Sequence, residues 1–136
     1  MEGTMFEKSS AVAVLFAGVA SLFPIPVLAA DVSAEITNAA LHAGLAAKGT
    51  DIGTVHTHLH HTINCLVGPG GAGFDAKELN PCANNGSGAI PDSTSASTKQ
   101  ALQAALAKAE NGLAATDVTT AQQEATAAAT VLKGIK

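Results

Sequence analysis

The sequence DIGTVHTHLHHTINCLVGP, residues 51–69, predicts a helix and carries four of the five histidines and one of the two cysteines. Asp51 is suited to cap the start of a helix and Gly68-Pro69 to end it, so we expect a helix over about residues 51–66. At about 100° per residue, the apolar side chains of this helix fall on one stripe that would face a core. The stripe consists of Ile52, Val55, Leu59, Ile63 and Leu66.

Three other segments repeat apolar residues three and four positions apart, as an amphipathic helix does. We predict these helices over about residues 32–48, 95–111 and 117–133. Each begins near an Asp, Ser or Thr able to cap it and is followed by a glycine that can end it. No segment alternates polar and apolar residues as a half-buried strand would, so the sequence predicts an all-α fold.

The connections between these helices predict how they pair. The turns between the first two helices and between the last two are short, so each pair should form an antiparallel hairpin. We therefore predict a small four-helix bundle made of two hairpins, as a single helical domain over residues 31–136. The helices are rich in alanine, which favours helix but buries little apolar area per residue.

A long loop rich in glycine and proline, residues 67–94, is expected between the two hairpins. A loop of this length in a small domain calls for a function or a covalent staple. Cys65 and Cys82, the only cysteines, are suitably placed to staple its first half. In an exported chain they most simply form one disulfide, which would close about 17 residues and stabilise the fold by about 3 kcal/mol.

The first 30 residues have the pattern of a secretory signal peptide. The apolar block at residues 11–23 is too short to span a bilayer comfortably, and Pro24 and Pro26 would break a longer helix. Small residues up to Ala30 suit cleavage. We expect a periplasmic or secreted protein with no membrane span in its mature form, and an uncleaved membrane anchor is the alternative.

The composition argues against two classes of function. The chain has 7 basic residues, all lysine, against 11 acidic ones, for a net charge of −4, and after residue 30 its only Phe, Tyr or Trp is Phe74. Without arginine, a basic patch or aromatic rings for stacking, we do not expect the protein to bind nucleic acid. A nucleophilic Cys65 would need a reduced thiol, which export disfavours, so we do not predict an enzyme.

The density of histidine predicts a metal site, because imidazole binds divalent copper, nickel and zinc. His56 and His60 lie four residues apart at one edge of the apolar stripe, a spacing that lets two imidazoles of one helix bind one ion. His42, on the first helix, is the expected third ligand because an antiparallel hairpin brings it opposite the second helix. Glu35 is the next candidate.

The other histidines of the cluster suggest a second set. His58 and His61 lie on the far side of the predicted helix from His56 and His60, and we expect them to form a secondary, weaker site. Cys65 would join it only as a free thiolate. The predicted function is buffering, sequestration or delivery of copper, nickel or zinc by an exported protein.

Three other interpretations of the histidines stay open. They would form a solvated surface with no dedicated site, or His42 and His60 would hold a b-type haem, although few large apolar side chains are available to line its pocket. The third is a structural or interaction protein of the cell envelope whose histidines respond to pH near their ordinary pKa of about 6.5. An envelope protein partner and a homodimer are further expectations.

The segment H-H-x-x-N-C-L-x-G at residues 60–68, followed by N-P-C at residues 80–82, resembles small uncharacterised exported bacterial proteins that carry the same pattern. This resemblance covers residues 56–92 and implies export without implying an activity. More loosely, the chain resembles small periplasmic histidine-rich metal-binding helical proteins. It differs from them in having one dense cluster of histidines, which argues against metal storage at high capacity.

Overall fold

The computed structural model describes residues 29–136, and within that range the chain forms helices and no strands. This confirms the predicted all-α class for the described residues. The helices are α1 (Val32–Ala46), α2 (Ile52–Val67), α3 (Ala89–Asp92), α4 (Ala96–Ala114) and α5 (Val118–Lys133). None of the helices in this range combines the length and the apolar character that crossing a bilayer requires. The predicted signal peptide, residues 1–30, lies outside the described residues except for its last two.

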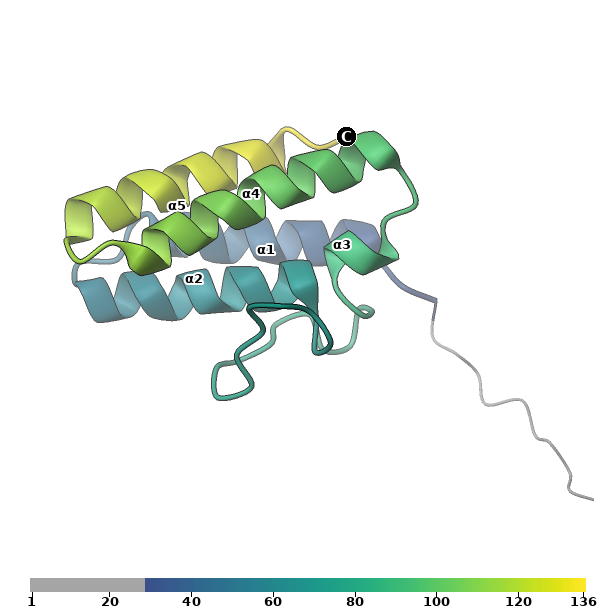
Figure 1. Ribbon diagram of the computed structural model, residues 1–136, viewed down its shortest axis with the longest axis horizontal. Coiled ribbons are helices and arrows are strands. Elements are labelled where there is room, and N and C mark those ends of the chain that lie inside the picture. Colours follow the sequence, from purple (N-terminus) through teal and green to yellow (C-terminus); the bar gives the residue numbers. More distant parts are fainter. Residues whose placement is uncertain (1–28) are drawn as a thin grey trace, which may run out of the picture.

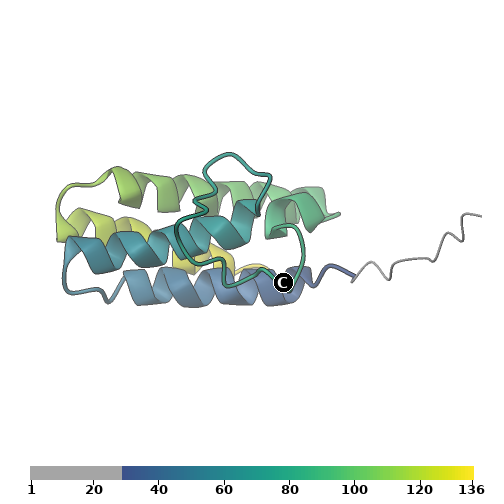
Figure 2. The ribbon, with the colours of Figure 1, turned by 90° about the horizontal axis from the view of Figure 1, so that it is seen from below.

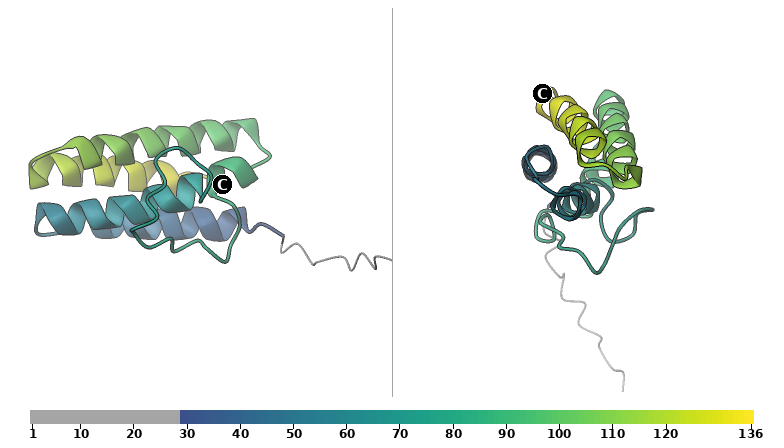
Figure 3. Two further views of the ribbon diagram at one scale, coloured as in Figure 1. Left: turned by 60° about the horizontal axis from the view of Figure 1, so that its bottom comes forward. Right: turned by 90° about the vertical axis from the view of Figure 1, so that its left-hand side faces the viewer.

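The four long helices run side by side, with the turn of each hairpin at the same end (Figure 1). α1 packs on α2 and on α5, and α4 packs on α5 and on α2. The segment between α2 and α3 crosses the outer side of α2 (Figure 2). An end-on view separates the hairpin of α1 and α2 from that of α4 and α5 (Figure 3, right).

Each long helix begins where a side chain satisfies a free backbone N–H of the first turn, as the sequence predicts. In all four, the capping oxygen accepts a hydrogen bond from the N–H three residues later. The pairs are Asp31 with Ala34 at 2.9 Å, Asp51 with Thr54 at 2.9 Å, Ser95 with Thr98 at 3.3 Å and Asp117 with Thr120 at 2.8 Å.

The core combines larger side chains, most of them from α2 together with Leu102 of α4 and Leu132 of α5, with alanines from the other helices. Of the predicted stripe on α2, four side chains are buried and Ile52 is half-buried. The alanines of α1, α4 and α5 that have no exposed surface are Ala39, Ala43 and Ala46 of α1, Ala105 and Ala109 of α4, and Ala121, Ala125 and Ala128 of α5. Small side chains let helices approach closely, which offsets part of the loss in apolar area.

Two local features differ from the sequence prediction. α4 continues past Asn111 and Gly112 to Ala114, because Gly112 is a packing position: a Cβ there would lie 2.7 Å from Leu59 Cδ1. A glycine inside a helix can thus mark close contact instead of an end. The expected loop over residues 67–94 also contains the four-residue helix α3.

The predicted Cys65–Cys82 disulfide is present, and both residues are buried. The segment that the disulfide closes, between Cys65 and Cys82, is also held by the side chain of Asn64, which is fully buried. Its Nδ2 donates to the carbonyls of Asp75 at 2.9 Å and Leu79 at 3.1 Å, and its Oδ1 accepts from the N–H of Asp75 at 2.9 Å. The part of the loop nearest α2 is therefore fixed both covalently and by hydrogen bonds.

Removing the disulfide with the Cys65→Ala/Cys82→Ala variant should lower the free energy of unfolding by about 3 kcal/mol, because the unfolded chain loses a closed loop. Urea unfolding followed by circular dichroism measures this. Wild-type protein unfolded with a dithiol reductant should show a similar loss without any change of side-chain volume. A loss below about 1 kcal/mol in both samples would contradict a stabilising staple.

Glu35 is a charged group in the core, with no exposed surface. Its Oε1 accepts a hydrogen bond from the N–H of Gly88 at 2.9 Å, while Oε2 has no partner. Burial raises the pKa of Glu35 from its ordinary value; the hydrogen bond from Gly88 lowers it, and the charges of Asp92 and Asp31 raise it further. The folded state therefore holds the proton of Glu35 more tightly than the unfolded state does.

A raised carboxyl pKa makes folding less favourable as pH rises from the unfolded value near 4.5 through the folded one. Glu35→Gln keeps the acceptor for Gly88 and removes the charge. Its stability relative to wild type should improve by about 1 kcal/mol or more between pH 4 and pH 7. Urea unfolding at the two pH values measures the difference, and a difference that does not change with pH would contradict a buried, charged Glu35.

Candidate metal centre

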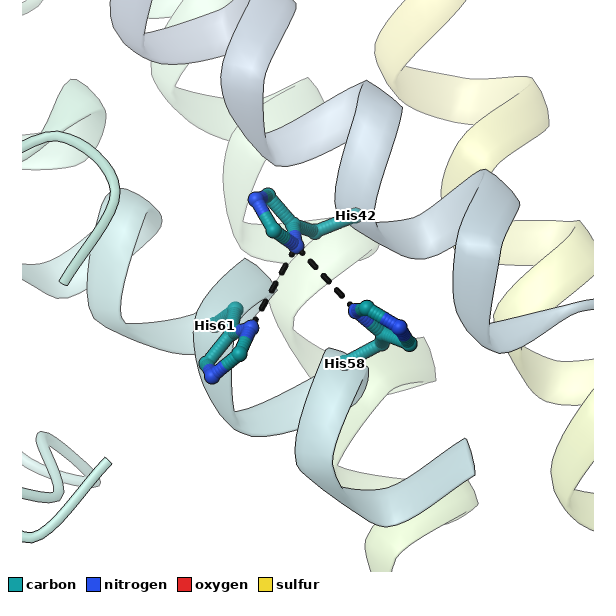
Figure 4. A group of neighbouring side chains, drawn as sticks. All are labelled: His42, His58 and His61. Carbon is teal, nitrogen blue, oxygen red and sulfur yellow. Dashed lines mark hydrogen bonds between the residues drawn. The ribbon is translucent and has the colours of Figure 1, made fainter. Parts of the chain in front are cut away.

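The hairpin of α1 and α2 brings together three imidazoles, His42 from α1 and His58 and His61 from α2 (Figure 4). The Nδ1 atom of His42 lies 3.3 Å from Nδ1 of His58 and 3.3 Å from Nδ1 of His61. One ligand atom from each of the three lies within 4.8 Å of the others. The cluster is close enough to hold a metal ion.

The antiparallel register of the two helices produces this meeting. His58 and His61 lie three residues apart, so their side chains share one side of α2. Directly after His61 in the sequence, Thr62 Oγ1 lies 3.0 Å from the His58 carbonyl within α2 and 3.5 Å from the Ala39 carbonyl of α1. Thr62 therefore marks the edge of α2 that faces α1, and one turn after Ala39 the chain of α1 reaches His42.

Burial and the neighbouring rings favour the neutral form of two of these imidazoles, those of His42 and His61. The pKa of His42 is lowered from 6.5 to about 4, first by burial and then by the neighbouring His61 and His58. The pKa of His61, which is 8% exposed, is lowered mainly by burial, while the Glu78 carboxylate opposes the shift. A metal ion binds only neutral imidazole, so both rings are in the ligating form at neutral pH.

The two contacts at His42 Nδ1 cannot both be ordinary hydrogen bonds. That nitrogen carries either one proton or one lone pair, and it faces two other Nδ1 atoms at 3.3 Å. Two nitrogens bound to one tetrahedral zinc ion at about 2.0–2.1 Å lie about 3.3–3.4 Å apart. These two spacings at His42 thus suit a shared ion better than they suit a chain of hydrogen bonds, and one ligand atom from each of the three rings lies within 4.8 Å of the others.

The structure divides the histidines differently from the sequence prediction. His56 Nε2 lies 3.1 Å from the carbonyl of Ala115, at the end of α4, and His60 Nδ1 lies 3.8 Å from Asp75 Oδ2 in the loop. Neither joins His42, so the expected primary set is not assembled, and the pair assigned to a weaker site is the one that meets His42. A b-type haem between His42 and His60 has no such meeting of rings to support it.

The reason is that an apolar stripe has two edges. The sequence prediction expects the edge of α2 that carries His56 and His60 to face α1. In the structure that edge faces the end of α4 and the loop, whereas the edge that carries His58 and His61 faces α1. The two remaining candidate ligands are also placed elsewhere: Glu35 hydrogen-bonds to Gly88, and Cys65 is in the disulfide.

Glu78 is a neighbour of the cluster that the sequence did not indicate. Its Oε2 lies 3.6 Å from Nε2 of His61, on the side of the ring opposite to the atom that meets His42. The carboxylate arrives from the loop between α2 and α3, 17 residues after His61 in the sequence. An acidic residue in a loop stapled beside a histidine helix is the signal that could have suggested it.

Comparisons of this chain with protein-family models, with curated proteins and with solved structures find no match. Function must therefore be inferred from the geometry and chemistry of these residues.

The lowered pKa of His42 predicts a pH dependence for the metal-free protein. The unfolded ring takes up a proton near pH 6.5, whereas the folded ring does so near pH 4. The contribution of neutral His42 to the free energy of unfolding is therefore fully present above about pH 6.5. It is lost as pH falls toward 4, by on the order of 1–3 kcal/mol. His61 acts in the same direction. Urea unfolding in the presence of a chelator measures the loss, which should shrink in His42→Gln; an equal loss in that variant would contradict the assignment.

Proposed function

We propose that this protein binds one divalent transition-metal ion through Nδ1 of His42, His58 and His61, and that it buffers, sequesters or delivers the metal outside the cytoplasm. The observation that carries the proposal is the pair of 3.3 Å contacts centred on His42 Nδ1. Three imidazoles from two packed helices form a rigid donor set, and helical bundles commonly build metal sites in this way.

The donor set narrows the choice of metal. Three neutral nitrogen ligands suit copper, nickel and zinc and suit magnesium or calcium poorly, because those ions prefer oxygen. Among the three metals, affinity at a site of this kind is expected to be highest for copper(II). Three protein ligands leave a coordination position for water or for a donor from a partner, which is compatible with a metal that must be passed on.

The proposed location outside the cytoplasm is supported by the chemistry of the chain. A disulfide persists in an oxidising compartment and is rare in the cytosol. The sequence of residues 1–30 has the pattern of a signal peptide. Metal exchange in the cell envelope would suit a small carrier with one ion site.

Titration of the purified, tag-free protein with copper(II), nickel and zinc, followed by calorimetry, tests the proposal. We expect one ion per chain with an affinity in the micromolar range or tighter. His42→Ala/His61→Ala should weaken binding at least about 100-fold, since one imidazole cannot chelate.

The matched control is His56→Ala/His60→Ala, which removes the same number of histidines from outside the cluster. This variant should bind with an affinity within about threefold of wild type. The opposite pattern, in which only the control variant loses binding, would assign the metal to the pair predicted from the sequence. Weak, unsaturable binding retained by both variants would contradict a dedicated site.

A further inference from the structure

Within the part of the chain that the structure describes, both ring nitrogens of His61 face polar groups. Nδ1 lies 3.3 Å from Nδ1 of His42, and Nε2 lies 3.6 Å from Glu78 Oε2. Neutral imidazole carries a proton on only one nitrogen, and the hydrogen bond made by one nitrogen decides whether the other has a free lone pair. The partner of Nε2 therefore decides whether Nδ1 of His61 can bind an ion.

We propose that Glu78 fixes His61 in the Nε2–H tautomer, and that Asn64 is the positioning residue that holds Glu78 there. This proposal rests on the proposed metal site for its purpose, although the tautomer can be measured without metal. A carboxylate behind a ligating histidine orients the ring and makes it a stronger donor, and losing such a group typically weakens metal affinity about 10–100-fold.

The distance is compatible with this role. At 3.6 Å, Nε2 and Oε2 are slightly farther apart than in a formed hydrogen bond, so a small rotation of the half-exposed Glu78 side chain must close the contact. The His61 ring itself has little freedom, because it is 8% exposed and lies against His42 and His58, with ring centroids 5.0 Å and 5.6 Å away. In this proposal the Glu78 side chain rotates toward His61, whose ring stays in place.

Asn64 fixes the position of the backbone that carries Glu78. Its Nδ2 donates to the carbonyls of Asp75 and Leu79, and its Oδ1 accepts from the N–H of Asp75, so one side chain binds the backbone on both sides of Glu78. Asn64 is fully buried and lies three residues after His61 on α2. The helix that carries the ligand therefore also carries the group that places the carboxylate beside it.

The charge around this contact favours Glu78 over other groups as the partner of His61. In the same loop, Asp75 faces His60 at 3.8 Å, and the Asp75 Oδ1 atom accepts from the N–H of Lys77. Asp75 thus faces the ring of His60, and Glu78 is the carboxylate that faces the cluster of His42, His58 and His61.

The first test is the tautomer of His61 in the metal-free protein, measured near pH 7.5 by two-bond 1H–15N correlation spectra of the imidazole rings. Wild type should show His61 almost entirely as Nε2–H. Glu78→Ala should populate the Nδ1–H form to a large fraction, while Glu78→Gln, which keeps an acceptor oxygen, should preserve Nε2–H. Lys77→Ala, next to Glu78 in the same exposed segment, is the matched control and should leave the tautomer unchanged.

The second test links the tautomer to the metal. Glu78→Ala should weaken zinc affinity about 10–100-fold with no more than a small change in urea unfolding of the metal-free protein. Asn64→Ala should weaken affinity by a similar factor and add little when combined with Glu78→Ala, because both act through one contact. If Asn64→Ala does not fold, the Glu78 variants still decide the role of the carboxylate.

Two results would overturn the proposal: an Nδ1–H tautomer of His61 in wild type, or a tautomer and an affinity that Glu78→Ala leaves unchanged. A protein that binds no metal but shows the expected shift of tautomer would instead contradict the proposed function alone. The two failures are therefore distinguishable.

Discussion

α1 and α2 lie close together where Ala39 of α1 meets Thr62 of α2, and the position of the histidines depends on this contact. Ala39, Ala43 and Ala46 have no exposed surface. Methyl groups let two helix backbones approach more closely than leucine side chains would, so the hydroxyl of Thr62 comes within 3.5 Å of the Ala39 carbonyl. At that separation the ring of His42 is within reach of two rings on α2. A bulkier residue at Ala39 would move the rings apart.

The parts of the fold that sequence reasoning predicted are those encoded locally. The four capping side chains and the apolar spacing fix where the long helices begin and which faces are buried, since both act within one or two turns. Gly112 ends the predicted helix but not the observed one, because a glycine has the same appearance in sequence whether it ends a helix or makes room for a neighbour such as Leu59. α3 has four residues, too few for an apolar period.

The candidate site was predicted in its residue types and only in part in its grouping. The three histidines of the cluster are among the five predicted ligands, and the meeting of His42 with α2 across the hairpin agrees with the prediction, whereas His56 and His60 lie outside the cluster. Whether His42 meets His56 and His60 or His58 and His61 depends on the side of α2 on which α1 packs. The apolar periodicity of α2 is compatible with either side, so the sequence does not decide between the two pairs. Glu78 lies beyond such reasoning for a related reason, because its position depends on hydrogen bonds made by Asn64 to a loop without regular structure.

The three imidazoles belong to a short stretch of chain. His42 is separated from His58 by 16 residues and from His61 by 19, whereas the contact of Gln122 with the Gly49 carbonyl, which ties α5 to the turn of the first hairpin, joins residues 73 apart. Closing a short segment loses little chain entropy, and local contacts form fast. The ligand set does not have to wait for the second hairpin. Under the proposed function, a metal ion that meets the chain during folding would find its donors assembled early and would help to nucleate the remaining fold.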